Sequence, residues 1–251
     1  MASFMYNMMS LRRSIPGASA LVRACYSRQY PEDKASEVFG LRFRSPLGLS
    51  GMDKSGGYLN QLSDYGFSFV CVGPPELSGK DGYFTPSAII SNIRKSKPRT
   101  IIAASLEYDF LPSFSMLYDF VDLFIVEMTE HNSDLMEEVL DELVGQRLCY
   151  DRHIPIILHL RAGINTETES IINFSRLSGI DGFGVDSIEE LVRLAEITSR
   201  RVPIIAWTTM ENPATVPSLI GEGASLVVME PENGKFRKGA AKKAFKLLNV
   251  K

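Results

Sequence analysis

The chain has 251 residues, of which 45% are hydrophobic and 23% are charged. This composition allows one large buried core, and the length is close to that of a single α/β barrel. The formal net charge of −3 at pH 7 argues against a dedicated nucleic-acid-binding protein, because contacts with phosphates would require a broad basic face.

The first thirty residues differ in composition from the rest of the chain. They contain four arginines and four methionines but no Asp or Glu. This composition is typical of a transit peptide or of a helix that lies at a membrane interface. Peripheral membrane contact through residues 1–30 is therefore left open. No apolar run in the chain approaches the roughly 20 residues that a membrane span needs.

Two alternating patterns follow in chain order. Val38–Arg44 alternates in a strand-like way with Gly40 in its middle, which predicts a small hairpin at the bottom of a barrel. Beyond it, eight short apolar runs are each followed by a polar loop, usually with an amphipathic stretch, and this βα alternation predicts a (β/α)8 TIM barrel. The predicted strands are Leu47–Ser50, Phe67–Val72, Thr100–Ala104, Leu123–Val126, Pro155–Leu160, Gly182–Val185, Pro203–Trp207 and Ser225–Met229.

Helices are predicted after most of these strands. Ser187 before two glutamates, and Asn212 before Pro213, are signals of a helix N-terminus. The segment Gly73–Lys97 is rich in proline and glycine and is predicted to be a long loop that helps to build an active site. The predicted helices are Gly57–Tyr65, Ser133–Leu148, Thr166–Leu177, Ser187–Thr198, Pro213–Gly221 and Lys238–Leu248.

The cysteines, the expected location in the cell and the charge of the carboxyl-terminal residues are considered next. The three cysteines are widely spaced and form no CxxC pair, so neither a disulfide framework nor a cysteine zinc site is predicted. We expect a cytoplasmic protein, with a peripheral position at the inner face of a membrane as the alternative. Residues 233–251 contain seven cations and no acid, which indicates a solvated helix face favoured by the helix dipole.

Three stretches of sequence carry a family resemblance. Residues 38–54 read Val-Phe-Gly-Leu-Arg-Phe-Arg-Ser-Pro-Leu-Gly-Leu-Ser-Gly-Met-Asp-Lys, residues 201–210 read Arg-Val-Pro-Ile-Ile-Ala-Trp-Thr-Thr-Met, and residues 222–229 read Glu-Gly-Ala-Ser-Leu-Val-Val-Met. The chain resembles the dihydroorotate dehydrogenases over nearly its whole length. The resemblance implies the cofactor flavin mononucleotide (FMN) and a barrel over residues 38–251. Residues 1–37 would be the helical extension of the membrane-associated class 2 enzymes, where the quinone oxidant docks.

The chain departs from the family where the cofactor phosphate should bind. The family holds this phosphate with backbone N–H groups of glycine turns after strands seven and eight, because a dianion needs several donors and no Cβ in the way. Here Thr208 and Thr209 replace a double glycine, and Glu230-Pro231-Glu232 replaces the second turn. The two threonines would contact the phosphate if FMN binds. Lys235 and Arg237 would then have to offset the two acids.

The loop after the fourth strand carries the family's catalytic base. Where the family reads Asn-x-Ser-Ser-Pro-Asn-Thr, residues 127–133 read Glu-Met-Thr-Glu-His-Asn-Ser. Glu130 stands at the base position, and a carboxylate is a competent general base. Asn132 and Ser133 match the family in type and are candidate substrate-binding residues. Glu127 replaces an asparagine that hydrogen-bonds orotate in the family, and its negative charge would repel the substrate carboxylate.

Further rim positions decide how flavin and substrate would be held. Lys54, which the family directs at both, is kept together with Asp53, although a salt bridge to a nearby acid would explain Lys54 equally well. His159 replaces the lysine that neutralises reduced flavin, and we expect it to be mostly uncharged at neutral pH. Ser105 replaces another asparagine, and Asp186-Ser187 replaces a Thr-Asn pair.

Without the family, three of these residues form a second candidate constellation. Glu127, His159 and Asp186 lie at the ends of three successive strands and would point inward at one level. A divalent metal would use such ligands, with Glu130 or His131 completing the set. In the alternative interpretation these groups satisfy one another and water. Trp207 would either fill the volume of a flavin ring or belong to the ordinary barrel core.

Three functions therefore compete. The favoured hypothesis is a barrel that has lost FMN-dependent oxidation of dihydroorotate, holds no cofactor and acts as a binding or regulatory module. A small-molecule ligand at the carboxyl face of the barrel, and homo- or hetero-oligomeric partners, are left open. The alternative is a divergent but active FMN-dependent oxidoreductase of pyrimidine biosynthesis, and the third is a metal-dependent barrel enzyme. In the active alternative the base is Glu130, the substrate is held by Lys54, Asn132 and Ser133, and the cofactor by Lys54, His159, Thr208 and Thr209.

Overall fold

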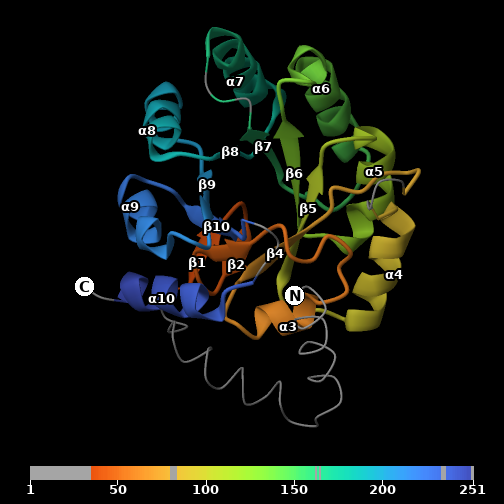
Figure 1. Ribbon diagram of the computed structural model, residues 1–251. Helices are drawn as coiled ribbons and strands as arrows, with labels where there is room; N and C mark the ends of the chain where they lie inside the picture. The colour runs from red at the N-terminus through yellow and green to blue at the C-terminus, as the bar shows by residue number, and fades with distance from the viewer. Residues whose placement is uncertain (1–34, 80–83, 162, 164, 233–235, 250–251) are drawn as a thin grey trace.

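Eight parallel strands close into a barrel in the computed structural model, which describes residues 35–79, 84–161, 163, 165–232 and 236–249 (Figure 1). The strand order β10-β3-β4-β5-β6-β7-β8-β9 follows the chain, as in a (β/α)8 barrel. The predicted strands and the predicted barrel are confirmed. The strands are β3 Leu47–Leu49, β4 Phe69–Val72, β5 Ile101–Leu106, β6 Leu123–Met128, β7 Ile156–Leu160, β8 Gly182–Val185, β9 Ile204–Thr209 and β10 Leu226–Glu230.

Several strands extend further toward the carboxyl end of the barrel than predicted. β5, β6 and β9 each end two residues later, at Leu106, Met128 and Thr209. The backbone pairing of β6 with β7 places Glu127 opposite His159 and continues to Met128 opposite Leu160. Polar residues at the rim therefore belong to the regular sheet, where side chains alternate between the inside and the outside of the barrel.

This alternation produces two apolar cores. One cluster lies between the barrel and its helices and includes Val70 and Val126. The other fills the barrel interior and includes Phe69 and Ile125. The removal of these side chains from water is the main driving force for folding. On β6 the interior stays apolar up to Ile125, and the next inward position is Glu127.

A hairpin covers the amino-terminal end of the barrel. β1 (Ser36–Val38) and β2 (Leu41–Phe43) pair antiparallel around a turn at Phe39 and Gly40, both of which have positive φ. The Phe39 ring packs against Gly182 of β8, where an added Cβ would lie 2.5 Å from the ring. The predicted hairpin is confirmed, and it begins two residues earlier than expected.

Helices surround the barrel on its outside (Figure 1). The six predicted helices are present, and two of them begin with a 3-10 turn. The predicted cap Ser187 accepts a hydrogen bond from the Glu190 N–H at the start of α8. The helices are α3 Leu59–Ser63, α4 Pro86–Ser96, α5 Phe110–Leu117, α6 Met136–Arg147, α7 Thr166–Ser178, α8 Ile188–Ile197, α9 Val216–Gly221 and α10 Lys238–Asn249, and the 3-10 turns are η3 Tyr118–Phe120, η4 Ser133–Leu135 and η5 Pro213–Thr215.

The prediction that Gly73–Lys97 is a long loop was wrong for its second half, which forms helix α4. Thr85 caps the helix by accepting a hydrogen bond of 3.3 Å from the Ala88 N–H. Pro86 occupies the first helical position, where a proline is tolerated because its missing N–H would be unpaired in any case. The proline that suggested a loop is therefore a helix start signal. Helix α5 was also not predicted.

Residues 1–34 lie outside the described residues, and with them nearly all of the predicted extension over residues 1–37. Within the ranges that the structure describes, no helix is both long enough and apolar enough to span a membrane. Membrane contact through residues 1–30 stays a prediction.

Candidate functional site

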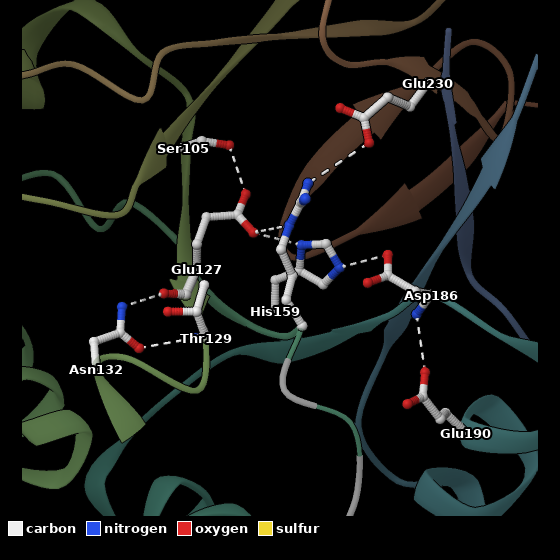
Figure 2. A network of polar contacts seen from close by, with 9 residues as sticks. Ser105, Glu127, Thr129, Asn132, His159, Asp186, Glu190 and Glu230 are labelled. Atoms are coloured by element: carbon white, nitrogen blue, oxygen red, sulfur yellow. Dashed lines mark hydrogen bonds and ion pairs between the residues drawn. The ribbon is translucent and has the colours of Figure 1, made fainter. Parts of the chain in front are cut away.

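Polar side chains gather inside the mouth of the barrel, at the carboxyl ends of the strands (Figure 2). Ser105 lies on β5, Glu127 on β6 and His159 on β7, each one inward position after an apolar interior residue. Asp186 directly follows β8, and Glu230 ends β10. The inward side chains of such strand ends converge on one small volume. We call this set, together with Arg161, the mouth network.

Glu127 is the centre of the mouth network and is only 4% exposed. Its Oε2 atom lies 2.7 Å from His159 Nδ1 and 2.8 Å from Arg161 Nε. Its Oε1 atom accepts a hydrogen bond of 2.9 Å from the Ser105 hydroxyl. Both carboxylate oxygens are therefore engaged by protein groups, as a buried charge requires.

His159 is fully buried between two carboxylates. Its Nε2 atom lies 3.1 Å from Asp186 Oδ1, and its Nδ1 atom faces Glu127. The Nδ1 contact is an ion pair without the alignment of a hydrogen bond. The imidazole stacks on the Trp207 indole, with ring centroids 3.7 Å apart and planes inclined by 17°. Gly184 makes room for this stack, because a Cβ there would lie 2.6 Å from the indole.

These contacts shift the pKa values of both buried groups. Burial alone would raise the pKa of Glu127, but the charges of His159 and Arg161 outweigh burial and lower it to about 2. Burial alone would lower the pKa of His159, but Glu127 and Asp186 outweigh burial and raise it to about 9. Both groups are therefore charged at neutral pH. The prediction of a mostly uncharged His159 was wrong, because it assumed the pKa of an isolated imidazole.

Arg161 was not singled out from the sequence, although it crosses the mouth. It follows β7 one inward position after His159, so the period of two along this strand was the signal for it. Its Nη2 atom lies 3.6 Å from Glu230 Oε2, while its Nε atom contacts Glu127. β7 and β10 are not neighbours in the barrel, so the guanidinium connects two separated parts of the rim.

The predicted substrate-binding residues Asn132 and Ser133 bond to the backbone of the loop after β6. The Asn132 amide donates to the Glu127 carbonyl at 3.0 Å and accepts the Thr129 N–H at 2.8 Å. The Ser133 hydroxyl donates to the Glu130 carbonyl at 3.4 Å. Glu130, the predicted base, is exposed, and its carboxylate forms no ion pair with the described residues of the mouth network.

Thr208 and Thr209 point in different directions. The Thr208 hydroxyl lies 2.7 Å from the hydroxyl of Thr215 in η5, outside the barrel. Thr209 pairs in register with Glu230 and so lies on the inward face of β9. Of the two threonines predicted to contact a phosphate, the structure places only Thr209 toward the mouth.

The carboxylate of Glu211 links the two turns. Glu211, which follows β9, pairs with Arg237 at 3.3 Å. The Glu232 N–H donates to the same Glu211 carboxylate at 3.4 Å. Arg237 is therefore engaged by Glu211, whereas the other predicted cation, Lys235, lies outside the described residues. The side chains around the expected phosphate position are mainly acidic.

Asp53 and Lys54 share the loop after β3 but differ in their surroundings. Asp53 is buried and accepts the N–H groups of Gly57 at 2.9 Å and Tyr58 at 2.5 Å, together with the Ser55 hydroxyl at 3.1 Å. Burial raises the pKa of Asp53, although these hydrogen bonds act in the opposite direction. Asp53 thus fixes the loop, and Lys54 is exposed on it.

The metal hypothesis gains no support from the residues that can be described. Among them, no group of three or more His, Cys, Asp or Glu side chains is arranged to hold a metal ion. Glu127, His159 and Asp186 do meet, but both imidazole nitrogens face a carboxylate. A metal could bind His159 only after one of these imidazole–carboxylate contacts was broken.

Comparisons with known proteins point to one family, although no protein-family model matches the chain. The quinone-type dihydroorotate dehydrogenase of Christiangramia forsetii is 29% identical over 173 residues, which are 55% of this chain and 50% of that protein. The enzyme of Acinetobacter baumannii is 24% identical over 62% of this chain and 61% of its own, and that of Coxiella burnetii is 20% identical over 80% of each. The chain is a distant homologue of the quinone-type dihydroorotate dehydrogenases.

Solved structures agree with this relationship at the level of the fold. A crystal structure of dihydroorotate dehydrogenase from Eimeria tenella in complex with ferulenol has a TM-score of 0.71, covers 94% of this chain and 92% of its own, and is 16% identical. A 2,3-dimethylmalate lyase has a TM-score of 0.58 at 13% identity. The chain spans about half of the Christiangramia forsetii dihydroorotate dehydrogenase, so that enzyme's activity does not transfer by sequence similarity alone.

The mouth does not fit the FMN that the resemblance to dihydroorotate dehydrogenases implies. In the described part of the two turns, Thr209 and Glu230 stand where bare glycine N–H groups are implied, and Pro231 has no N–H to donate. Arg161 crosses the opening to Glu230. Trp207 occupies the barrel interior, where it stacks on the buried imidazole of His159.

Proposed function

We propose that this chain is a non-catalytic relative of the dihydroorotate dehydrogenases that keeps the barrel as a binding or regulatory module and holds no flavin. The observation that carries the proposal is the Arg161 side chain, which contacts Glu127 and Glu230 from opposite parts of the rim. A flavin would have to displace charges that already have partners in the protein. Such a displacement costs free energy, chiefly because the buried Glu127 carboxylate would lose the Arg161 counterion.

Carboxylates near the implied phosphate position add a repulsion. A carboxylate about 5 Å from a phosphate charge costs on the order of 3 kcal/mol per charge pair at an effective dielectric constant of about 20. One such pair weakens binding by roughly a hundredfold. Glu230 and Glu232 both flank this position. Arg161 partly offsets the charge of Glu230, whereas Arg237 does not offset Glu232 because it pairs with Glu211.

Neither of the two carboxylates considered for the base, Glu127 and Glu130, suits that role in the described part of the mouth. A general base works best when its pKa is near the working pH. The pKa of Glu127 is lowered to about 2, and its carboxylate is already paired with His159 and Arg161. Glu130 is exposed and lies outside the mouth network. Neither carboxylate therefore supports proton abstraction inside the barrel.

A divergent flavoenzyme is the second candidate, and one observation favours it. The resemblance places a flavin-neutralising cation at position 159, and the carboxylates of Glu127 and Asp186 keep His159 protonated at neutral pH. A positive charge is thus retained there although the lysine is not. In this alternative Glu130 would be the base, and the substrate would be held by Lys54, Asn132 and Ser133.

An absorbance spectrum of freshly purified protein separates the two candidates. We expect no flavin bands, and no saturable quenching of flavin fluorescence when FMN is titrated in. The Acinetobacter baumannii enzyme, purified and titrated in parallel, is the matched control. Oxidation of dihydroorotate with a soluble quinone should stay at the level of the blank. Stoichiometric flavin in the isolated protein, or turnover above the blank, would establish the flavoenzyme instead.

A further inference from the structure

A groove on the outer surface, away from the barrel mouth, runs between helix α4 and the 3-10 turn η3. Its volume is about 550 Å³, which is within the usual range of small-molecule sites, about 300–1,000 Å³. η3 ends directly before β6 at the amino-terminal side of the barrel, so the groove opens on a different side from the mouth network. It is lined by Ser87, Ile90, Ser91, Arg94, Lys95 and Phe120.

The spacing of residues on α4 explains how this lining arises. The buried face of the helix carries Ile89 and Ile93, which pack on the barrel. The groove residues of α4 recur at intervals of three and four positions and therefore form one stripe on a different face. Ile90 is half-buried in this stripe, and Phe120 is half-buried opposite it. The lining of the groove thus combines two apolar side chains with two serines and two cations.

The cations of the groove have no carboxylate partners among the described residues. The Arg94 guanidinium lies 4.7 Å from the centre of the Phe120 ring, a cation–π contact that holds it over the groove. Neither Arg94 nor Lys95 takes part in an ion pair found in the described ranges, although other exposed arginines such as Arg152 and Arg193 do. Residues 84–106 contain no acid, and the exposed Lys97 adds a further cation.

We propose that this groove binds a small organic anion, a carboxylate or phosphate ester attached to an apolar ring or short chain. The Arg94 guanidinium presents planar N–H donors that suit carboxylate and phosphate oxygens, and Lys95 adds a second positive charge. Ser87 and Ser91 supply hydroxyl donors along the same wall. The apolar part of the ligand packs on Ile90 and Phe120. This site does not depend on the function proposed for the barrel mouth.

Three probes test the two parts of this ligand class by isothermal titration calorimetry. 2-Naphthoate carries both an anion and an apolar ring, 2-naphthalenemethanol has the ring without the charge, and inorganic phosphate has the charge without the ring. We expect saturable binding of naphthoate at one site per chain and at least tenfold weaker binding of each of the other two. Equal binding of the neutral alcohol or of phosphate would overturn the proposal, and so would the absence of saturable naphthoate binding by protein with an intact melting transition.

Paired variants locate the binding in the groove. Arg94→Gln combined with Lys95→Gln should weaken naphthoate binding at least tenfold, and Phe120→Leu should weaken it less. The matched control is Lys242→Gln combined with Lys243→Gln, which removes two exposed cations from α10 and should leave affinity unchanged. Melting temperatures verify that each variant is folded. Unchanged affinity in the Arg94 and Lys95 variant, or binding only to phosphatidylglycerol vesicles, contradicts the small-ligand site.

Discussion

Phe43 and Phe69 fill the amino-terminal end of the barrel interior, where their rings meet edge to face with centroids 5.5 Å apart. At the carboxyl end, Glu127 on β6, His159 on β7 and Arg161 directly after β7 are held together by charge. Apolar packing is non-directional and almost independent of pH, whereas an ionised cluster depends on every partner being present and charged. The two ends of one interior should therefore respond differently to substitution and to pH.

The largest effect is expected at the apolar end. Phe69→Ala should lower the free energy of unfolding by about 3–5 kcal/mol, because it removes a buried ring and leaves a cavity. The ring packs against Gly48, where an added Cβ would lie 2.2 Å away, so little material is available to refill the space. Urea unfolding at several pH values measures this loss, which should not vary between them. Leu148→Ala, at a side chain that is 80% exposed, is the control with an effect near zero.

A smaller loss is expected from the centre of the mouth network. Glu127→Gln should lower the free energy of unfolding by about 2–3 kcal/mol, because His159 and Arg161 lose their shared counterion. The loss stays below that at Phe69 because His159 can release its proton. The same urea experiment measures it, with the exposed Glu130→Gln as the matched control. If both glutamate variants had equally small effects, the charges at the mouth would contribute little to stability.

The pH dependence distinguishes the two ends further. The pKa of His159 is raised from 6.5 to about 9, so its contribution to stability is complete below about pH 6.5 and disappears as pH rises through about 9. The pKa of Glu127 is lowered from 4.5 to about 2, so its contribution is present above about pH 4.5 and disappears as pH falls toward 2. The melting temperature should decline from pH 6.5 to 9 in the natural protein and much less in His159→Gln. Parallel curves would contradict a protonated His159.

The smallest effect concerns the acids at the implied phosphate position. Glu230→Gly combined with Glu232→Gly should raise FMN affinity from undetectable to weak, because two repulsive charges are removed and Arg161 loses one of its partners. Flavin fluorescence measures the change. Thr208→Gly, which resembles the family sequence, should have no effect, because Thr208 faces Thr215 outside the barrel. If the double variant behaves like the natural chain, the obstruction lies with other residues such as Trp207.

Most of the fold could be predicted because it follows from local pattern. Each strand is a short apolar run, and the hairpin is marked by alternation around Gly40. Helix α4 was missed because Pro86 was interpreted as a helix breaker. Thr85 is a favourable N-cap residue, and a proline directly after an N-cap is a signal that a helix begins. Strand ends were placed too early because polar residues such as Glu127 look like loop residues until their partners are known.

The candidate site could be predicted only in part, because its properties depend on contacts between distant positions. The sequence indicated that Glu127, His159 and Asp186 would share one level, and the structure brings them together. The charge of His159 could not be derived from its residue type, since it depends on two carboxylates from neighbouring strands. Arg161 was missed because the predicted strand ended at Leu160, so the period of two that marks position 161 as inward was not followed past the strand end. Its contact with Glu230 depends on a strand far along the chain.

Trp207 is the only tryptophan in the chain, and it lies against a histidine whose protonation state changes with pH. Intrinsic indole fluorescence therefore originates from a single place, next to the cluster of charges. A protonated imidazole quenches an adjacent indole more strongly than a neutral one does. The fluorescence of Trp207 thus reports the protonation state of His159 without an added dye. Its intensity should increase at alkaline pH, as the imidazole loses its proton.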